Sequence, residues 1–380
     1  MSGGRWRRRQ TAGRREERES IRTRHSAVKS APSVEIREVR PRGLDELSPG
    51  FVALEAGHSV AVLPPAAAAV CRAAVPVAGG PWMGVTSSGS TGTPKLVWRR
   101  WPDFKAAASR QPSVRGWVWA APFDPWSFAG VQVAVQAWAN AGRAVSLRGA
   151  GPGLWRTLQE ERVDAVSATP TFFDLLLQNE PGEGAAWTPR QVSLGGEPLR
   201  PALGQRLSAR WPGARFAAIY AAAEFGVLLK TQRRDGWYEV DALNRRGLEW
   251  RVPDGVLEVR DERGWRSTGD QVEVRAGLLR VIGRADQVAN VAGTKVNLAE
   301  VGRLAEEVPG VARAVAVAES SPVTGQVVCL RYAPVPGEDP GELRRRLEAC
   351  LFPRLPKAGW PRDWVVDELA PARNAKRRVR

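Results

Sequence analysis

The sequence predicts an α/β protein with a mostly parallel sheet, on two observations. Between residues 116 and 194, short apolar runs alternate with stretches of helical pattern, which is typical of parallel strands joined by helices. Strands are expected at 116–122, 144–147, 163–168 and 191–194, and helices at 129–139, 154–161 and 169–178. At 380 residues, the chain is also long enough for two domains with a sizeable core.

The net charge of +16 lies mainly in two short segments, residues 1–40 with +7 and residues 373–380 with +5. The remaining chain is nearly balanced, which argues against nucleic acid as the main partner. Residues 1–32 are polar and charged with almost nothing to bury, so they are expected to form a disordered basic tail. A small helix is expected at 66–74.

Scarce cysteine and histidine exclude several function classes. Cys71, Cys329 and Cys350 are scattered and odd in number, which argues against a disulfide framework or a zinc site and favours a cytoplasmic protein. His25 and His58 are the two histidines, so a Ser-His or Cys-His hydrolase would lack its general base. No apolar stretch reaches the length of about 18 residues that predicts a membrane span.

Residues 86–95 are rich in hydroxyl side chains, contain two glycines and end at Lys95. Glycine allows backbone N–H groups to surround an anion, and a lysine adds positive charge. The spacing is not that of a Walker loop. Apolar residues at 83–85 and 96–98 predict a strand–loop–strand hairpin, and a flexible linker is the alternative.

This stretch resembles the phosphate loop of the adenylate-forming (AMP-binding) superfamily, which includes acyl-CoA synthetases, adenylation domains and luciferase. Residues 88–95 fit the pattern S-G-[ST]-T-G-x-P-K, and Leu96 replaces the glycine that usually follows. The resemblance implies that ATP phosphates are bound here. The implied phosphate-binding residues are Ser87, Ser88, Gly89, Ser90, Thr91, Gly92 and Lys95.

Two later motifs resemble the family's adenine-binding segments. Gly195, Gly196 and Glu197 follow a predicted strand and match G-G-x-x-L, although a plain tight turn explains two glycines equally well. Tyr220 and Ala221 open a stretch similar to Y-G-x-T-E. The resemblance implies that Tyr220 flanks adenine.

The stretch similar to Y-G-x-T-E ends at Glu224. The resemblance implies that the Glu224 carboxylate binds Mg²⁺, a metal that prefers oxygen ligands. Ala221 and Ala223 replace the usual glycine and threonine. The lost threonine hydroxyl normally contacts the phosphates in this family.

Two further motifs, T-G-D and G-R-x-D, follow at family spacing. They place Asp270 where the family's carboxylate accepts the ribose hydroxyls and Arg284 on the ribose or phosphate side. Asp286 would be the hinge of a small C-terminal domain, and Asn290 replaces the lysine usual after it. Each motif alone is a common turn, whereas their shared order supports the resemblance.

A small α+β C-terminal lid domain is expected after this hinge. Asn297 has capping-box spacing to Glu300 and predicts a helix that ends near residue 308. Strands are expected at 314–318, 327–332 and 364–366, with a helix at 340–350. The expected domains are therefore the tail at 1–32, a shortened AMP-binding domain at 33–284 and the lid at 285–380.

Residues 373–380 match the family segment that carries its catalytic lysine. Arg378 stands in the place of that lysine, and Lys376, two residues earlier, is the alternative. Arginine keeps the charge but is planar and bulkier, so the two are not equivalent at a tight site. A basic chain end without a role in catalysis is the other interpretation.

The resemblance implies ATP-dependent activation of a carboxylic acid as an acyl-adenylate, with transfer to a thiol, most simply that of CoA. The implied cofactors are ATP and Mg²⁺, with CoA as cosubstrate. Alternatives are an adenylation enzyme that loads a carrier protein, a nucleotide-binding pseudoenzyme, and a nucleic-acid-binding protein with a borrowed fold. Residues 121–132 are similar to o-succinylbenzoate–CoA ligases, and Trp126 and Phe128 there either gate an acid channel or pack in the core.

Overall fold

The computed structural model describes residues 36–65, 80–87, 95–108, 112–181, 187–245, 247–261, 264–285, 287–335 and 337–366. The chain divides into two units, residues 1–35 and 36–380, and every described residue belongs to the second. The predicted basic tail and the helix expected at 66–74 lie outside the described residues.

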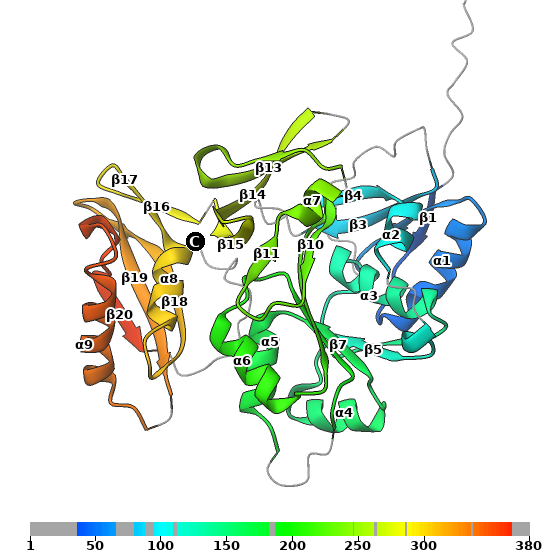
Figure 1. Ribbon diagram of the computed structural model, residues 1–380, viewed down its shortest axis with the longest axis horizontal. Helices are drawn as coiled ribbons and strands as arrows, with labels where there is room; N and C mark the ends of the chain where they lie inside the picture. The colour runs from blue at the N-terminus through cyan, green and yellow to red at the C-terminus, as the bar shows by residue number, and fades with distance from the viewer. Residues whose placement is uncertain are drawn as a thin grey trace, which may run out of the picture. The chain divides into compact units, whose positions relative to one another are not determined.

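A central sheet with the strand order β6-β5-β7-β8-β9-β10 organises the second unit (Figure 1). Its strands are β5 Val118–Ala121, β6 Arg143–Ser146, β7 Ala165–Ala168, β8 Gln191–Gly195, β9 Arg215–Ala222 and β10 Gly226–Thr231. Neighbouring strands from β6 to β9 are parallel, and β10 joins the edge antiparallel to β9. The predicted parallel α/β sheet is thereby confirmed.

Helices cover both faces of this sheet: α3 Phe128–Ala139, α4 Leu154–Glu160, α5 Pro170–Gln178 and α6 Pro201–Arg210. Alternate strand residues point to opposite faces, and they enter two separate cores. Ala120, Val166 and Leu194 pack in a core that also holds residues of α4, α5 and α6. Trp119 and Ala165 pack on the other face with residues of α3.

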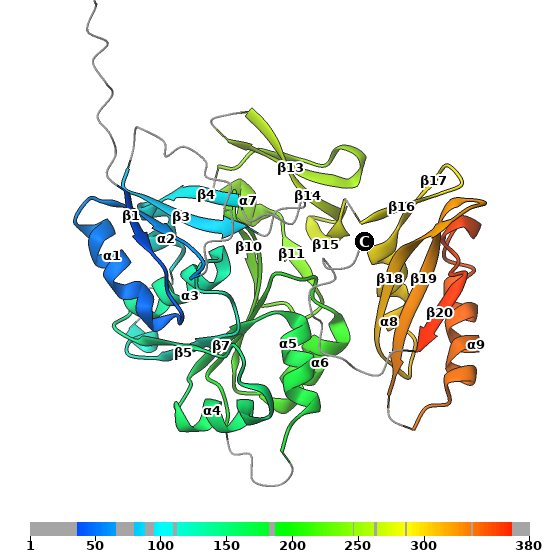
Figure 2. The same cartoon turned by 180° about the vertical axis from the view of Figure 1, so that it is seen from behind.

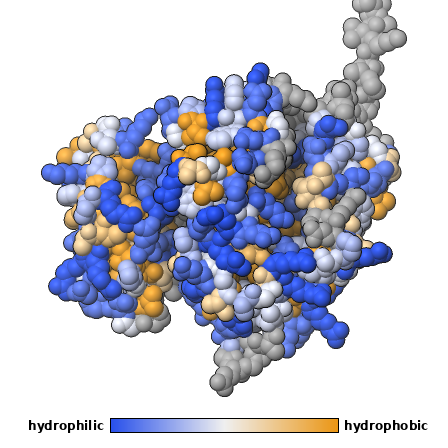
Figure 3. Space-filling model, viewed as in Figure 1, coloured by the Kyte–Doolittle hydropathy of each residue, from blue (hydrophilic) through white to orange (hydrophobic). Residues whose placement is uncertain are grey.

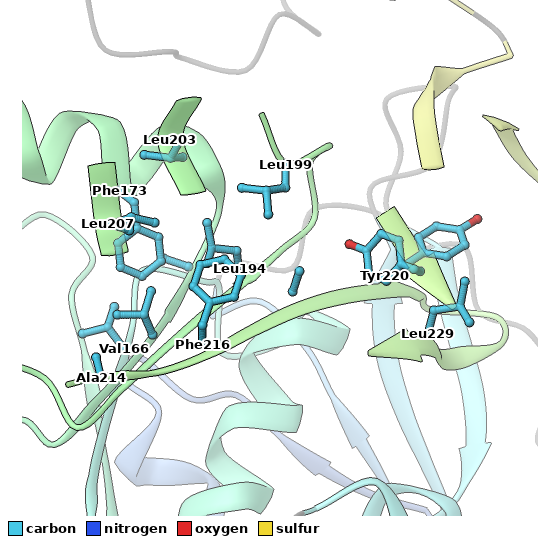
Figure 4. Packing of buried hydrophobic residues seen from close by; sticks show 14 of the residues in the cluster. Val166, Phe173, Leu194, Leu199, Leu203, Leu207, Ala214, Phe216, Tyr220 and Leu229 are labelled. Atoms are coloured by element: carbon cyan, nitrogen blue, oxygen red, sulfur yellow. The ribbon is translucent and has the colours of Figure 1, made fainter. Parts of the chain in front are cut away.

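The first of these cores lies between the sheet and helices α5 and α6. Figure 4 shows Val166, Leu194 and Phe216 of the sheet beside Phe173, Leu203 and Leu207 of the two helices. Three tryptophans extend this core toward α4, with ring centroids 5.5 to 6.3 Å apart: Trp155, Trp187 and Trp211. The face of the sheet that carries Val166 and Leu194 is thus closed by solid packing.

A four-stranded N-terminal sheet has the order β1-β2-β3-β4. Its strands and helices are β1 Ile36–Val39, α1 Ser48–Glu55, β2 Ser59–Val62, β3 Trp82–Ser87, β4 Lys95–Arg100 and α2 Trp101–Ala107. β3 and β4 pair antiparallel with Ser87 opposite Lys95. The predicted hairpin around the phosphate loop is confirmed in its two strands.

A third, antiparallel sheet follows the central one and has the order β11-β15-β14-β13-β12. Its elements are β11 Trp237–Glu239, α7 Asp241–Arg245, β12 Trp250–Arg251, β13 Val256–Asp261, β14 Gly264–Arg275 and β15 Leu278–Arg284. Asp270 lies within β14 and Arg284 ends β15. The T-G-D and G-R motifs are therefore parts of paired strands rather than isolated turns.

The C-terminal part forms an α+β fold with its own core. Its elements are β16 Val288–Val291, β17 Thr294–Asn297, α8 Leu298–Glu306, β18 Val311–Ser321, β19 Gly325–Pro334, α9 Pro340–Leu351 and β20 Asp363–Val366 (Figure 2). The side chain of Asn297 accepts hydrogen bonds from the N–H groups of Ala299 and Glu300, as the predicted cap requires. The helix ends at Glu306, two residues earlier than expected.

Hydrophilic side chains cover most of the face shown in Figure 3. Several arginines lie over aromatic rings, as Arg210 does over Trp155 and Trp211 at 5.8 and 5.6 Å from the ring centroids. In such contacts the guanidinium cation lies over the electron-rich face of the ring. Within the described residues, no helix combines the length and the apolar character needed to cross a bilayer.

Candidate active site

A cavity of about 450 Å³ lies between α3 and the strands β7 to β10 of the central sheet. Aromatic side chains form part of its wall: Trp119, Phe123 and Phe128. Small residues form its floor on the sheet side: Ser193, Gly195, Ala217 and Ala221. A volume of this size accommodates a small organic ligand.

Three of the predicted nucleotide-binding residues line this cavity: Gly195, Gly196 and Ala221. Gly196 has a φ of +83°, a backbone conformation that favours glycine. The neighbouring Glu197 side chain instead accepts hydrogen bonds from the Thr171 N–H at 3.0 Å and hydroxyl at 2.6 Å, at the start of α5. The glycines therefore give the cavity a stretch of wall without side chains, and Glu197 ties this turn to α5.

Tyr220, Asp270 and Arg284, which are up to 64 residues apart in sequence, meet in one cluster. The Tyr220 hydroxyl donates to Asp270 Oδ2 at 2.7 Å, and Arg284 Nη1 donates to Asp270 Oδ1 at 3.2 Å. Burial, followed by the negative charge of Asp270, raises the pKa of Tyr220 well above its usual value. The phenol therefore stays protonated and holds the carboxylate in place as a donor.

Glu224 lies at the tip of the turn between β9 and β10, where its residue is exposed. Arg99 Nη1 donates to the Glu224 backbone carbonyl at 3.0 Å. Arg99 and Lys95 are four residues apart on β4, so their side chains leave the same face of the strand. Arg99 therefore connects the strand after the phosphate loop to the acidic turn.

The residues present fit a magnesium ion that arrives with ATP. Among the described residues, none donates a hydrogen bond to the Glu224 carboxylate, which leaves its oxygens available. No three acidic, histidine or cysteine side chains gather as a complete metal site in the described part of the chain. Mg²⁺ is commonly held by one or two carboxylates together with substrate phosphates, and Glu224 offers one.

Replacing Arg99 by alanine should lower the rate of the acyl-adenylate formation that the resemblance implies by about tenfold or more, because a charge-assisted bond that holds the Glu224 turn is lost. Arg99→Lys keeps one cationic donor and should recover part of the rate. The measurement is pyrophosphate release as a function of Mg²⁺ concentration. Arg100→Ala, at an exposed neighbouring position, is the matched control, and equal rates for the Arg99 and Arg100 variants would contradict the positioning role.

Sequence reasoning left the roles of Trp126 and Phe128 open, and the structure separates them. Phe128 lines the cavity and packs against Phe104, with centroids 5.5 Å apart. The Trp126 carbonyl accepts from the Thr86 N–H at 2.7 Å, and its ring lies under Arg148. Trp126 therefore anchors the base of the hairpin, and Phe128 contributes to the cavity.

Other predicted site residues lie outside the described residues: Ser88, Gly89, Ser90, Thr91, Gly92, Asp286, Lys376 and Arg378. Sequence reasoning, in turn, missed two described residues of this region, Arg99 and Lys230. No motif marks them, because their importance depends on the elements that they face. Gln132, the last residue of the segment similar to o-succinylbenzoate–CoA ligases, also lines the cavity.

Comparison with known proteins agrees with this architecture. The family model for AMP-binding enzymes matches residues 58–285, more than half of the chain. A salicylyl-CoA synthase / salicylate adenylyltransferase from Streptomyces sp. is 27% identical over 336 residues, covering 74% of this chain and 59% of that protein. Phenyloxazoline synthase MbtB of Mycobacterium tuberculosis is 28% identical over 250 residues, covering 53% of this chain and 18% of the synthase.

A solved structure of E. coli MenE with bound OSB-AMS superposes with a TM-score of 0.66 at 17% identity, covering 90% of this chain and 86% of that chain. At this identity the likeness shows the fold. The chain spans 59% of the length of the Streptomyces relative and 18% of the length of MbtB. The match to the family model includes the whole of the central sheet and of the third sheet. The chain belongs to the AMP-binding enzyme family, the adenylate-forming enzymes.

Proposed function

We propose that this chain activates an aromatic carboxylic acid with ATP and transfers the acyl group to a thiol, as an acid–thiol ligase. The observation that carries this proposal is that Gly195, Gly196 and Ala221, which the family's motifs assign to the nucleotide, line the same cavity as the aromatic residues. An acid in the cavity and a nucleotide against these three residues would place a carboxylate beside an α-phosphate. Proximity and orientation of that kind lower the barrier to forming a mixed anhydride.

On the nucleotide side, Asp270 would accept the two ribose hydroxyls, and Tyr220 would flank adenine. Arg284, beside Asp270, would face the ribose or phosphate side. Lys95 would neutralise phosphate charge from the end of the hairpin, and Mg²⁺ held by Glu224 would supply further positive charge. Preorganised charges of this kind stabilise the charge that develops on a phosphate during the transfer.

On the acid side, the aromatic wall supports a flat, apolar substrate. Trp119 and Phe128 line the cavity, and aromatic rings pack well against one another at offset or edge-on geometries. The floor offers glycine, alanine and serine, which leave space for a ring. The name of the Streptomyces relative, a salicylyl-CoA synthase, supports an aromatic acid as well.

CoA is the acceptor that we propose, and an acyl carrier protein is the alternative. The basic segments at residues 1–40 and 373–380 favour partners of negative charge, a description that fits both the phosphates of CoA and an acidic carrier surface. Lys376 or Arg378 would supply the C-terminal cation near the α-phosphate during adenylation, and Asp286 would be the hinge of the C-terminal lid at 285–380.

The test is pyrophosphate release from ATP–Mg²⁺ with a panel of aromatic and fatty acids, with hydroxylamine added to trap the acyl-adenylate. Release with aromatic acids is expected, and Lys95→Ala or Glu224→Gln should lower it about 100-fold or more, since each removes a charge at the phosphates. Lys357→Ala changes an exposed lysine far along the chain and is the control. Supplying CoA or an acyl carrier protein then identifies the acceptor.

Absence of release with every acid would contradict catalysis. If ATP still bound, the chain would be a nucleotide-binding pseudoenzyme. Recovery of release in Arg378→Lys would then locate the cause in the substitution of the family's lysine. Binding of nucleic acid that persisted in Lys95→Ala and weakened steeply with salt would instead favour a nucleic-acid-binding protein that has the adenylate-forming fold.

A further inference from the structure

The first turn of helix α8, in the C-terminal part, rests on the third sheet. The Asn297 side-chain amide, just before the helix, donates to Gln271 Oε1 on β14. Ala299 lies so close to Gly283 of β15 that a methyl group at position 283 would come within 2.4 Å of the Ala299 Cβ atom. Gly283 is the last residue but one of β15, so this contact holds the start of α8 beside the end of the third sheet.

The last residue of α8, Glu306, makes a second contact outside the C-terminal part. Arg200 Nη1 lies 3.2 Å from Glu306 Oε2, and Arg200 is the residue that directly precedes helix α6. At a rise of 1.5 Å per residue, Ala299 and Glu306 lie about 10 Å apart along α8. Two attachments at this separation fix the direction of the helix, whereas the first contact alone would let it pivot.

Arg200 is held in place independently of Glu306. Its Nη2 group donates to Asp174 Oδ2 on α5, and Arg206 Nη1 donates to Asp174 Oδ1 at 2.8 Å. The side chains of Arg200 and Asp174 are 26% and 12% exposed, so solvent ions screen their attraction only in part. If Glu306 moved away, Arg200 would therefore keep a charged partner.

Glu306 also keeps a partner of its own. Its Oε1 atom accepts from the Ala314 N–H at 3.1 Å, within the C-terminal part. Burial raises the pKa of Glu306 even though Arg200, the Ala314 N–H and the charge of Arg313 act in the opposite direction. The carboxylate would therefore regain hydration on leaving Arg200, and this gain offsets much of the lost attraction. The contact is thus suited to form and break reversibly.

We propose that Arg200 and Glu306 are positioning residues, whose ion pair holds the C-terminal lid in one of two orientations. This inference rests on the proposed function, in which one lid serves two half-reactions: formation of the acyl-adenylate with release of pyrophosphate, and displacement of AMP by the thiol. Neither residue lines the cavity. They act through α8, and separation of the pair biases the lid toward its other orientation.

The first readout is the mobility of the lid, which needs no substrate. Amide hydrogen exchange of the full-length protein is followed on the helix that each substitution leaves unaltered: α6 in Glu306→Gln, and α8 in Arg200→Gln. Exchange about fivefold faster than in wild type is expected in both, because the contact that closes each helix against the other is weakened. Glu306→Gln keeps an oxygen for the Ala314 N–H, so the C-terminal part itself should stay folded.

Neighbouring charges supply matched controls. Glu307 follows Glu306 and pairs with Arg303 and Arg354, both within the C-terminal part. Arg206 shares Asp174 with Arg200, and its printed ion pair stays on the central part of the chain. Glu307→Gln and Arg206→Gln therefore remove the same charges without breaking the contact of α8 with Arg200, and exchange of the facing helix should stay at the wild-type rate.

The second readout separates the two half-reactions. Pyrophosphate release measures adenylation, and thioester formation from preformed acyl-adenylate measures the transfer. Arg200→Gln and Glu306→Gln should each change the ratio of the two rates by about five- to tenfold, since the ion pair stabilises one lid orientation over the other. The double variant should change the ratio no more than the larger single change, because both substitutions break the same pair.

Equal slowing of both half-reactions, additive effects in the double variant, or exchange no faster than in the controls would overturn the inference. If circular dichroism showed that Arg200→Gln does not fold, Glu306→Gln against Glu307→Gln would decide alone. If no acid released pyrophosphate but exchange rose only in the Arg200 and Glu306 variants, the proposed function would fail, and the hold of this ion pair on the C-terminal part would stand.

Discussion

Replacing Asp270 by asparagine is expected to weaken ATP binding by about 100-fold, with a matching loss of pyrophosphate release. The carboxylate of Asp270 is held by the Tyr220 hydroxyl and by Arg284, and in the proposed function it also accepts the ribose hydroxyls. Hydrogen bonds to a charged acceptor contribute about 1.5–3 kcal/mol each, and each 1.4 kcal/mol is about tenfold in affinity. Asparagine keeps one oxygen but loses the charge and offers an N–H₂ group in place of the second acceptor.

Calorimetry with ATP gives the affinity, and the pyrophosphate assay gives the rate. Tyr220→Phe is the matched comparison, because it keeps the ring that would flank adenine and removes only the donor to Asp270. A loss smaller than tenfold is expected for it. Undiminished ATP affinity in Asp270→Asn would place the ribose elsewhere.

Replacing Trp211 by alanine should lower the free energy of unfolding by about 3–5 kcal/mol, the range for large-to-small changes in a packed core. Trp211 is only 1% exposed, and its ring meets those of Trp155 and Trp187 at centroid distances of 6.3 and 5.5 Å. Its removal leaves a cavity between α4, α6 and the sheet. The midpoint of urea unfolding, followed by far-UV circular dichroism, measures the loss.

Trp211→Phe should cost much less than Trp211→Ala. The phenyl ring still fills most of the space, and the indole N–H of Trp211 has no partner among the described residues, so no hydrogen bond is lost. Trp265→Ala, at a tryptophan with 37% exposure, is the surface control. Equal midpoints for Trp211→Ala and Trp265→Ala would show that the cluster does not stabilise the sheet.

The parallel sheet could be predicted because its strands are short apolar runs that are separated by helices. β5, β7 and β8 all lie where the apolar pattern predicts them. The third sheet escaped prediction because β14 mixes charged, polar and glycine residues along its length. Gly269 makes its motif look like a turn in the sequence, and in the structure its φ is +72°. The pairing of β14 with β15 is irregular shortly after it, between Gln271 and Val272.

Residues of the candidate site could be predicted from the sequence only where they belong to a short motif. The cluster of Asp270 and Arg284 was proposed from motifs, and the structure brings those two side chains into contact. The role of Arg99 could not be predicted, since Arg99 meets the Glu224 turn from 125 residues away in the sequence. Such contacts arise from packing between elements, which local sequence does not encode.

The alternation of the central strands has a consequence for how this protein can diverge. Val192 and Leu194 of β8 belong to the core beneath the sheet, whereas Ser193, between them, faces the cavity. β9 repeats this division with Ala218 and Ala217. Substitutions at Ser193 and Ala217 can therefore change the shape of the cavity without removing a side chain from the core that holds Val192, Leu194 and Ala218. These two positions leave this protein room to alter what its cavity accepts at little cost in stability.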